Sequence, residues 1–140
     1  MSAIHGTAVA RGGRGVLILG ASGAGKSALA LELMALGADL VADDAVLLQK
    51  SGAGVCMRAP ESIAGCIEAR GVGLITVKPI VSAGLAFIVD LDKTEVSRLP
   101  RPHFRHILNV KIRLIHGKGQ VGLGPVMWCL LGGGRLVPTE

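Results

Sequence analysis

The sequence predicts an α/β fold, and three features of the chain lead to that prediction. An apolar run, Gly15–Leu19, directly precedes a glycine-rich loop. A segment of good helix formers, Lys26–Leu36, follows the loop and ends at a glycine suited to a C-terminal cap. Short β-prone segments separated by glycine or proline then continue to Asp90. Because 140 residues suit one domain and no repeat or linker divides them, residues 1–140 are predicted to form a single domain.

The predicted elements follow one another as in a βαβ unit. Ile4–Ala10 and Gly15–Leu19 are expected to form a hairpin, and Ala38–Ala42 is a short apolar strand after the helix. Val121–Glu140 is rich in glycine, so we assign it no element and expect much of it to be poorly ordered. The remaining strands are expected at Ala45–Gln49, Val55–Arg58, Cys66–Ala69, Leu74–Val77 and Leu85–Asp90.

The composition limits the functions open to the chain. A net charge of +5 favours an anionic partner. Nucleic acid is a poor candidate, because the basic residues are scattered and only 2% of the residues are aromatic, which leaves few side chains to stack on bases. A phosphate-rich ligand explains the same charge, and a merely basic surface is the alternative.

Cysteine usage and hydropathy predict a cytoplasmic protein. The three cysteines are odd in number and lack metal-ligand spacing, which is typical of a reduced intracellular chain. The most apolar region, Val16–Ala42, is interrupted by charged residues at Lys26, Glu32 and Asp39. We therefore predict no membrane span.

The loop GASGAGKS fits the phosphate-loop pattern, with the expected strand before it and helix after it. Backbone N–H groups of such a loop surround the β-phosphate, Lys26 reaches the β and γ oxygens, and the Ser27 hydroxyl binds Mg²⁺. The sequence thus predicts a nucleoside triphosphate site. Its contacts would come from Gly20, Ala21, Ser22, Gly23, Ala24, Gly25, Lys26 and Ser27.

Two adjacent carboxylates, Asp43 and Asp44, follow the strand Ala38–Ala42. If that strand runs parallel to Gly15–Leu19, its carboxyl end lies at the same sheet edge as the phosphate loop. One carboxylate could then orient hydrated Mg²⁺, and the other could accept a proton from an attacking hydroxyl. The alternative is a solvated turn that happens to begin with two acids.

Three more residues are candidates for the same edge. If the hairpin turns at its two central glycines, His5 faces Gly20 and borders the phosphates; a structural or exposed histidine is the alternative. Glu68 and Arg70 lie two apart on a predicted strand, so both face the same side. They form either a surface ion pair or a Mg²⁺-directed carboxylate beside an arginine for phosphate oxygens.

Together these residues resemble the HPr kinase/phosphorylase family, bacterial enzymes that act on a seryl residue of the phosphocarrier protein HPr. The phosphate loop alone is unspecific, but its combination with IHG before it, LVADD after its helix and IE-x-RG-x-G downstream is specific. The resemblance runs from Ile4 to about Leu99. The matching segments are IHGTAV, GVLILGASGAGKSALALELMALGADLVADDAVLL, IEARGVGLITV and SRLP.

The resemblance implies how the phosphates and the metal are held. Lys26 would be the phosphate-loop lysine, and ATP would be the nucleotide. Ser27 and Glu68 would be Mg²⁺ ligands, and Asp43 would support the metal and its water.

The resemblance also implies which residues act on the transferred group. Asp44 would be the base that takes the seryl proton, and the acid that returns it in the reverse reaction. His5 and Arg98 fall on the family's other active-site positions, near the transferred phosphoryl group. The reverse reaction would consume inorganic phosphate and release pyrophosphate.

For the fold, the resemblance implies a kinase core related to phosphoenolpyruvate carboxykinase, with a mixed sheet, in a homo-oligomer that is usually a hexamer. The chain resembles the short, alphaproteobacterial form, which lacks the N-terminal domain of the long form. The long form's PVKVG-type loop has only a faint echo in Asn109–Leu114.

Two other functions stay open. A small-molecule P-loop kinase also has an acid soon after the first helix, but such kinases usually carry an arginine-rich helical lid, and the region after Asp44 is rich in predicted strands. A nucleotide-binding regulatory module without catalysis is compatible with the glycine-rich tail, although the complete set of candidate site residues argues against it.

Overall fold

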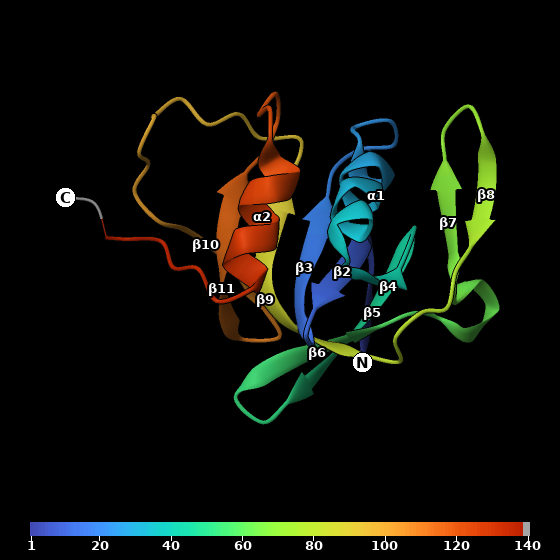
Figure 1. Cartoon of the computed structure of the whole chain (residues 1–140). Coiled ribbons are helices and arrows are strands. Elements are labelled where there is room, and N and C mark those ends of the chain that lie inside the picture. The colour runs from blue at the N-terminus through green and yellow to red at the C-terminus, as the bar shows by residue number, and fades with distance from the viewer. Residues whose placement is uncertain (139–140) are drawn as a thin grey trace.

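The computed structural model describes residues 1–138, which form one large mixed sheet, a two-stranded hairpin and two helices (Figure 1). The α/β class and the mixed sheet expected from the sequence are thereby confirmed. In chain order the elements are β1 (Ser2–His5), β2 (Thr7–Arg11), β3 (Arg14–Leu19), α1 (Lys26–Leu36), β4 (Asp39–Ala42), β5 (Ala45–Ser51), β6 (Gly54–Arg58), a 3₁₀ turn (Glu61–Ile63), β7 (Cys66–Ala69), β8 (Gly73–Thr76), β9 (Ala83–Asp90), β10 (His103–Ile107), β11 (Val110–His116) and α2 (Leu123–Leu131).

The large sheet branches at β9. Its strands lie in the order β1–β5–β6–β9–β3–β2–β4, and β11, which pairs with β10, also pairs with β9. The first residues of β9 pair with β6, whereas its last residues pair in parallel with β11. Because β9 is also parallel to β3, the carboxyl ends of β3, β9 and β11 meet at one edge of the sheet.

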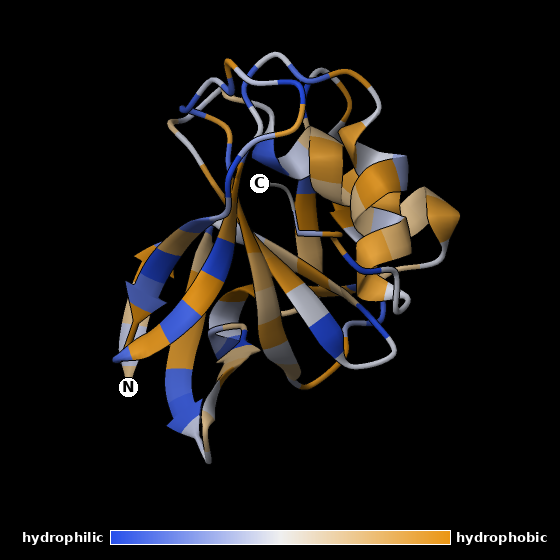
Figure 2. Cartoon of the chain, turned by 90° about the vertical axis from the view of Figure 1, so that its left-hand side faces the viewer, coloured by the Kyte–Doolittle hydropathy of each residue, from blue (hydrophilic) through white to orange (hydrophobic). Residues whose placement is uncertain are grey.

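Apolar side chains cover both faces of this sheet, because successive residues of a strand point to opposite faces. Val16 and Ile18 of β3 pack on the face that α1 and α2 cover. Leu17 and Leu19 of the same strand belong to a second core on the opposite face. Figure 2 shows the resulting apolar colour along the central strands and both helices. The strand that delivers the phosphate loop is therefore fixed from both sides.

Gly6 separates the first two strands, which have different partners. β1 pairs with β5 and β2 with β4, both antiparallel. The two registers are continuous, so Gly6 lies opposite Asp44 and Thr7 opposite Asp43, and the Gly6 N–H donates to the Asp44 carbonyl at 3.1 Å. A Cβ at Gly6 would lie 2.9 Å from the carbonyl oxygen of Ile18, so this close approach requires glycine.

The hairpin register predicted from the sequence is confirmed over β2, where Thr7 pairs with Ile18 and Ala10 with Gly15. Continued past Gly6, the same register would set His5 opposite Gly20. The strand pair that His5 forms is with Ala45 of β5, on the other side of the strand. The position of His5 beside the phosphates therefore stays a prediction.

The expectation of a poorly ordered tail is wrong for its first part, because Leu123–Leu131 forms α2, which packs on the same apolar face as α1. Arg11 donates to the carbonyl of Trp128 at 2.9 Å, and Arg14 donates to that of Leu131 at 3.2 Å. Positive groups at the C-terminal end of a helix stabilise it. Within residues 1–138, no helix is long and apolar enough to cross a membrane.

Candidate functional site

The predicted βαβ arrangement is present and positions the site. β4 runs in the same direction as β3, because each is antiparallel to β2, which lies between them. The phosphate loop follows β3 and the two aspartates follow β4, so both lie at the same edge of the sheet. This edge is the usual place for ligands in parallel α/β sheets.

The phosphate loop takes its shape from glycine backbones. Gly23 and Gly25 have φ values of 85° and 103°, a left-handed conformation that other residues rarely adopt. Gly25 ends the loop at the N-terminus of α1, and no side chain caps that terminus. Free N–H groups and the positive end of a helix favour a bound anion. The loop therefore has the backbone that a phosphate site requires.

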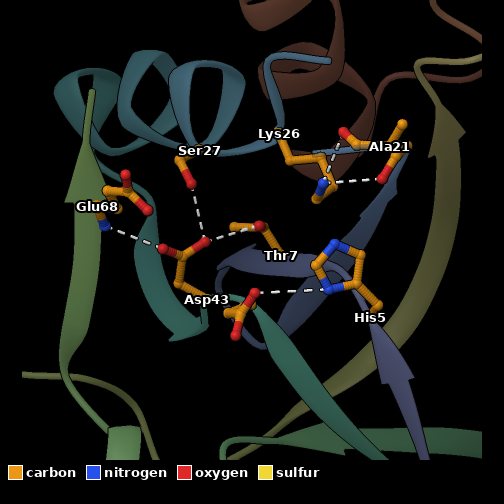
Figure 3. Close-up of polar contacts among 9 residues, drawn as sticks. His5, Thr7, Ala21, Lys26, Ser27, Asp43 and Glu68 are labelled. Atoms are coloured by element: carbon orange, nitrogen blue, oxygen red, sulfur yellow. Dashed lines mark hydrogen bonds and ion pairs between the residues drawn. The ribbon is translucent and has the colours of Figure 1, made fainter. Parts of the chain in front are cut away.

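Lys26 is the first residue of α1 and is only 7% exposed. Its Nζ donates to the carbonyl oxygens of Gly20 at 2.8 Å and Ala21 at 3.0 Å (Figure 3). The ammonium group is therefore held against the backbone of the loop that would bind the phosphates.

Asp43 is the centre of the polar network at this edge (Figure 3). Its Oδ1 accepts hydrogen bonds from Thr7 Oγ1 at 2.8 Å and Ser27 Oγ at 2.9 Å. Its Oδ2 accepts the backbone N–H of Glu68 at 2.9 Å. The side chain is buried, with 8% exposure. One carboxylate thus joins β2, α1, β4 and β7.

Asp44 lies in a strained turn directly after Asp43. The N–H of Ala45 donates to the Asp43 carbonyl at 2.9 Å, and the φ of Asp44 is 70°. This is the rarer form of γ-turn, and strained residues of this kind cluster at functional sites. Asp44 Oδ1 lies 3.5 Å from His5 Nδ1, and the two side chains are 80% and 52% exposed. The Asp44 carboxylate therefore faces solvent, with one weak partner.

Glu68 and Arg70 both belong to this edge, although Arg70 lies beyond the end of β7. Figure 3 shows the Glu68 side chain beside Asp43 and Ser27. A Cβ at Gly23 would lie 3.2 Å from Arg70 Nη1, so the guanidinium rests on the phosphate loop. The sequence left two interpretations of Glu68 and Arg70, a surface ion pair or a carboxylate for Mg²⁺ beside an arginine for phosphate oxygens. Because each side chain lies against the phosphate-loop edge, the arrangement favours the second.

No contact of Arg98 with the residues of this edge is found within residues 1–138. Arg98 is exposed in the irregular segment between β9 and β10. None of the hydrogen bonds or ion pairs found among residues 1–138 includes its side chain. Its active-site role remains a prediction from the resemblance.

Sequence reasoning missed Thr7 and Asp92. Thr7 is fully buried and has no charge, so nothing in the sequence marked it as a partner of Asp43. Asp92 accepts the N–H of Ala21 with both carboxylate oxygens, at 3.1 and 2.9 Å. It follows β9, which is parallel to β3, so the argument that singled out Asp43 would also have found it.

A cavity of about 640 Å³ lies beside the phosphate loop. Its walls are the loop itself, Leu29 and Glu32 of α1, Leu91 and Asp92 after β9, and residues 117–123 before and at the start of α2. A cavity of this size is typical of small-molecule and cofactor sites.

The donors at the edge suit Mg²⁺. Ser27 supplies a hydroxyl, and Asp43 and Glu68 supply carboxylates, which are the hard oxygen ligands that Mg²⁺ prefers. Asp43 already orients the Ser27 hydroxyl and the backbone of Glu68. The site residues present therefore fit a magnesium-bound phosphate chain.

Comparison with known proteins gives the family. The family model described as HPr Serine kinase C-terminal domain matches residues 1–116. The HPr kinase/phosphorylase of Exiguobacterium sibiricum is 46% identical over 84 residues, which are 59% of this chain and 27% of the relative. The HPr kinase/phosphorylase of Alkaliphilus metalliredigens is 39% identical over 123 residues, which are 78% of this chain and 40% of the relative. The chain thus spans about a quarter to two fifths of the length of these relatives.

A solved structure has the same fold. The structure of the Hpr(Ser) kinase/phosphatase from Coxiella burnetii matches with a TM-score of 0.78 and 22% identity, over 94% of each chain. The matched family region contains the phosphate loop, both aspartates and the β7–β8 hairpin. Since the family model covers most of the chain, the chain belongs to the HPr serine kinase C-terminal domain family.

Proposed function

We propose that this chain is an ATP-dependent, Mg²⁺-requiring kinase that phosphorylates a seryl side chain of HPr. The observation that carries the proposal is the pair of carboxylates at the phosphate-loop edge, Asp43 buried against Ser27 and Asp44 exposed beside it. The family description and the names of the relatives support HPr as the protein that receives the phosphoryl group.

The phosphate loop would bind the triphosphate. Lys26 would exchange the carbonyls of Gly20 and Ala21 for the β and γ phosphate oxygens and neutralise their charge. Ser27 and Glu68 would hold Mg²⁺, which when bound neutralises charge on the phosphate oxygens. The cavity beside the loop has room for the nucleoside.

Three residues would act on the acceptor and the transferred phosphoryl group. Asp44 would accept the proton of the seryl hydroxyl as its oxygen attacks the γ-phosphorus of ATP, and the bond to the β–γ bridging oxygen breaks to release ADP. His5, whose Nδ1 lies 3.5 Å from Asp44 Oδ1, would stabilise the charge of the Asp44 carboxylate or exchange a proton with it. Arg98 would neutralise the moving phosphoryl group, which requires the segment before β10 to bring it to the site.

The reverse reaction would use the same groups. Protonated Asp44 would return its proton to the seryl oxygen as inorganic phosphate attacks the phosphoserine phosphorus. The products would be HPr and pyrophosphate, which is the phosphorylase activity in the relatives' name.

The test incubates the purified chain with γ-labelled ATP, Mg²⁺ and HPr from the same genome. Label on one serine of HPr, absent when that serine is alanine and lost in Lys26→Ala, is the expected result. Label on a metabolite instead would favour a small-molecule kinase. Nucleotide binding without any transfer would favour a regulatory module, and either outcome would overturn the proposal.

We also propose that residues 1–140 act as one catalytic domain within a homo-oligomer, a hexamer by resemblance. The β7–β8 hairpin projects from the body of the molecule (Figure 1), and its Val72 and Leu74 are 86% and 74% exposed. Apolar side chains so exposed are typical of contact surfaces. Light scattering should give a multimeric mass that falls in Val72→Ser/Leu74→Ser.

A further inference from the structure

Three side chains with metal-binding atoms meet at the end of β11, and the proposed kinase reaction uses none of them. Glu95 lies in the segment after β9, His103 begins β10 and His116 ends β11. His103 Nε2 lies 2.7 Å from Glu95 Oε1, and His116 Nδ1 lies 3.9 Å from the same oxygen. The three candidate ligand atoms all lie within 4.8 Å of one another.

The fold builds this cluster from three separate segments. β10 and β11 pair so that His103 lies opposite Leu114, and β11 pairs with β9 so that His116 lies opposite Asp90. Glu95 is only 12% exposed, and its second oxygen accepts the Ser97 N–H at 3.1 Å. Its first oxygen therefore stays directed at the two rings.

We propose that Glu95, His103 and His116 form a binding site for one transition-metal dication, with Zn²⁺ as the best match. Two imidazole nitrogens and one carboxylate oxygen are donors that Zn²⁺ favours, whereas Mg²⁺ prefers oxygen ligands. Three protein ligands leave a fourth position for water or another group. None of the three ligands belongs to the phosphate-loop site.

The surroundings shift the pKa values of two members of the cluster. Burial, and then the neighbouring His103, lower the pKa of His116 below its usual 6.5, while the Glu95 carboxylate acts in the opposite direction. The hydrogen bond from His103, and then that from the Ser97 N–H, lower the pKa of Glu95 below 4.5. Of the flanking charges, Lys93 lowers and Asp90 raises the pKa of His116.

Metal binding must change the two rings. They are stacked, with centroids 4.0 Å apart and planes 12° from parallel. An imidazole nitrogen donates its lone pair in the plane of its ring, so one ion can bind both rings only after at least one turns out of the stack. Binding would also fix the segment that carries Glu95 and Arg98 to the end of β11, directly before the cavity wall that begins at Gly117.

The test is titration of the metal-stripped full chain with Zn²⁺ in excess Mg²⁺, by calorimetry and by NMR of the histidine ring protons. The matched control is His106→Ala, which removes an exposed histidine from the same strand, β10. We expect the wild type and His106→Ala to bind one Zn²⁺ per chain, with ring-proton shifts at His103 and His116. Amide exchange should slow between Lys93 and Arg98.

Two cluster variants decide the outcome. Glu95→Gln keeps the size of the side chain and can still hydrogen-bond, and His116→Ala removes one ring; thermal unfolding checks that each is folded. Both should lose the Zn²⁺ binding seen in the wild type. The proposal is overturned if the wild type binds no Zn²⁺, or if either folded variant binds it as the wild type does, because the ion would then lie elsewhere, for example on the free cysteines.

Discussion

The floor of the site, around Asp43, and its rim, around Asp44, differ in every respect that decides what a carboxylate can do. Asp43 is 8% exposed and accepts three hydrogen bonds. The Asp44 side chain is 80% exposed, its one polar contact within residues 1–138 is with His5 at 3.5 Å, and the φ of Asp44 is 70°. The two are neighbours in the chain, so the backbone bend opposite Gly6 and Thr7 creates the difference.

This contrast supports the two roles that the family resemblance implies for the two aspartates. A buried carboxylate that accepts three hydrogen bonds is suited to orienting Ser27 and Glu68, and those bonds favour its charged form over a protonated one. An exposed carboxylate with one weak partner can meet a hydroxyl that arrives from solvent. We therefore assign the metal-supporting role to Asp43 and the proton-accepting role to Asp44.

Removing the Asp43 carboxylate should have the largest effect. Asp43→Ala leaves the buried Thr7 hydroxyl and the Glu68 N–H without their partner, so the free energy of unfolding should fall by about 3 kcal/mol. Phosphorylation of HPr should be lost as well. Urea unfolding and the transfer assay measure both changes. Asp39→Ala, which removes an exposed carboxylate from the start of the same strand, is the control and should change neither.

Neutralising Asp44 should slow phosphoryl transfer without changing the free energy of unfolding. Asp44→Asn keeps the shape of the side chain and suits a positive φ, so stability should stay within about 0.5 kcal/mol. Transfer should fall by about 10²–10⁴, the usual contribution of a general base. The acidic limb of the pH–rate profile should also disappear. A fall of less than about tenfold would mean that another group takes the proton.

Removing the hydrogen bond from Thr7 to Asp43 should give an intermediate effect. Thr7→Val keeps the volume of a fully buried side chain but removes the hydroxyl that donates to Asp43, so the unfolding free energy should fall by about 1–2 kcal/mol. The Mg²⁺ concentration needed for half-maximal transfer should rise. Thr7→Ser retains the donor and should need no more Mg²⁺ than the wild type. If the valine and serine variants needed the same Mg²⁺ concentration, the Thr7 hydroxyl would have no role in positioning Asp43.

The smallest effect should come from Asp92, which lies at the loop but outside both regions. Its bonds to the Ala21 N–H are exposed, so Asp92→Asn should change stability by no more than about 0.5 kcal/mol. Removing a negative charge beside the triphosphate should strengthen ATP binding by at most about 1 kcal/mol. Calorimetric titration with ATP measures this, and Asp39→Asn is the matched control. Weaker ATP binding in Asp92→Asn would mean that this carboxylate helps to shape the loop.

The parts of the site that local sequence dictates could be predicted. The loop from Gly20 to Ser27 carries its own glycine pattern, and its strand and helix adjoin it in sequence. The placement of Asp43 and Asp44 needed only the parallel direction of β4, which follows from the short connection through α1. The family resemblance implied a mixed sheet, and the structure has one.

The parts that depend on distant contacts could not be predicted. Nothing local marks the close approach of Gly6 to the Ile18 carbonyl, or the change of partner from β4 to β5 that pairs His5 with Ala45. α2 is held by Arg11, far earlier in the chain, and its own glycine-rich surroundings suggest no helix. The burial of Lys26 depends on how the loop folds back over its ammonium group.

The assignment of the two carboxylates is tested most directly by equilibrium titration of Asp43→Asn and Asp44→Asn with ATP in the presence of Mg²⁺. We expect Asp44→Asn to bind Mg²⁺–ATP with wild-type affinity, because within residues 1–138 the contact found for its carboxylate is with His5 and not with Ser27 or the phosphate loop. Asp43→Asn should bind Mg²⁺–ATP more weakly than the wild type, while its affinity for ATP without Mg²⁺ stays unchanged. Loss of Mg²⁺–ATP binding in Asp44→Asn, with wild-type binding in Asp43→Asn, would contradict the account and exchange the two roles.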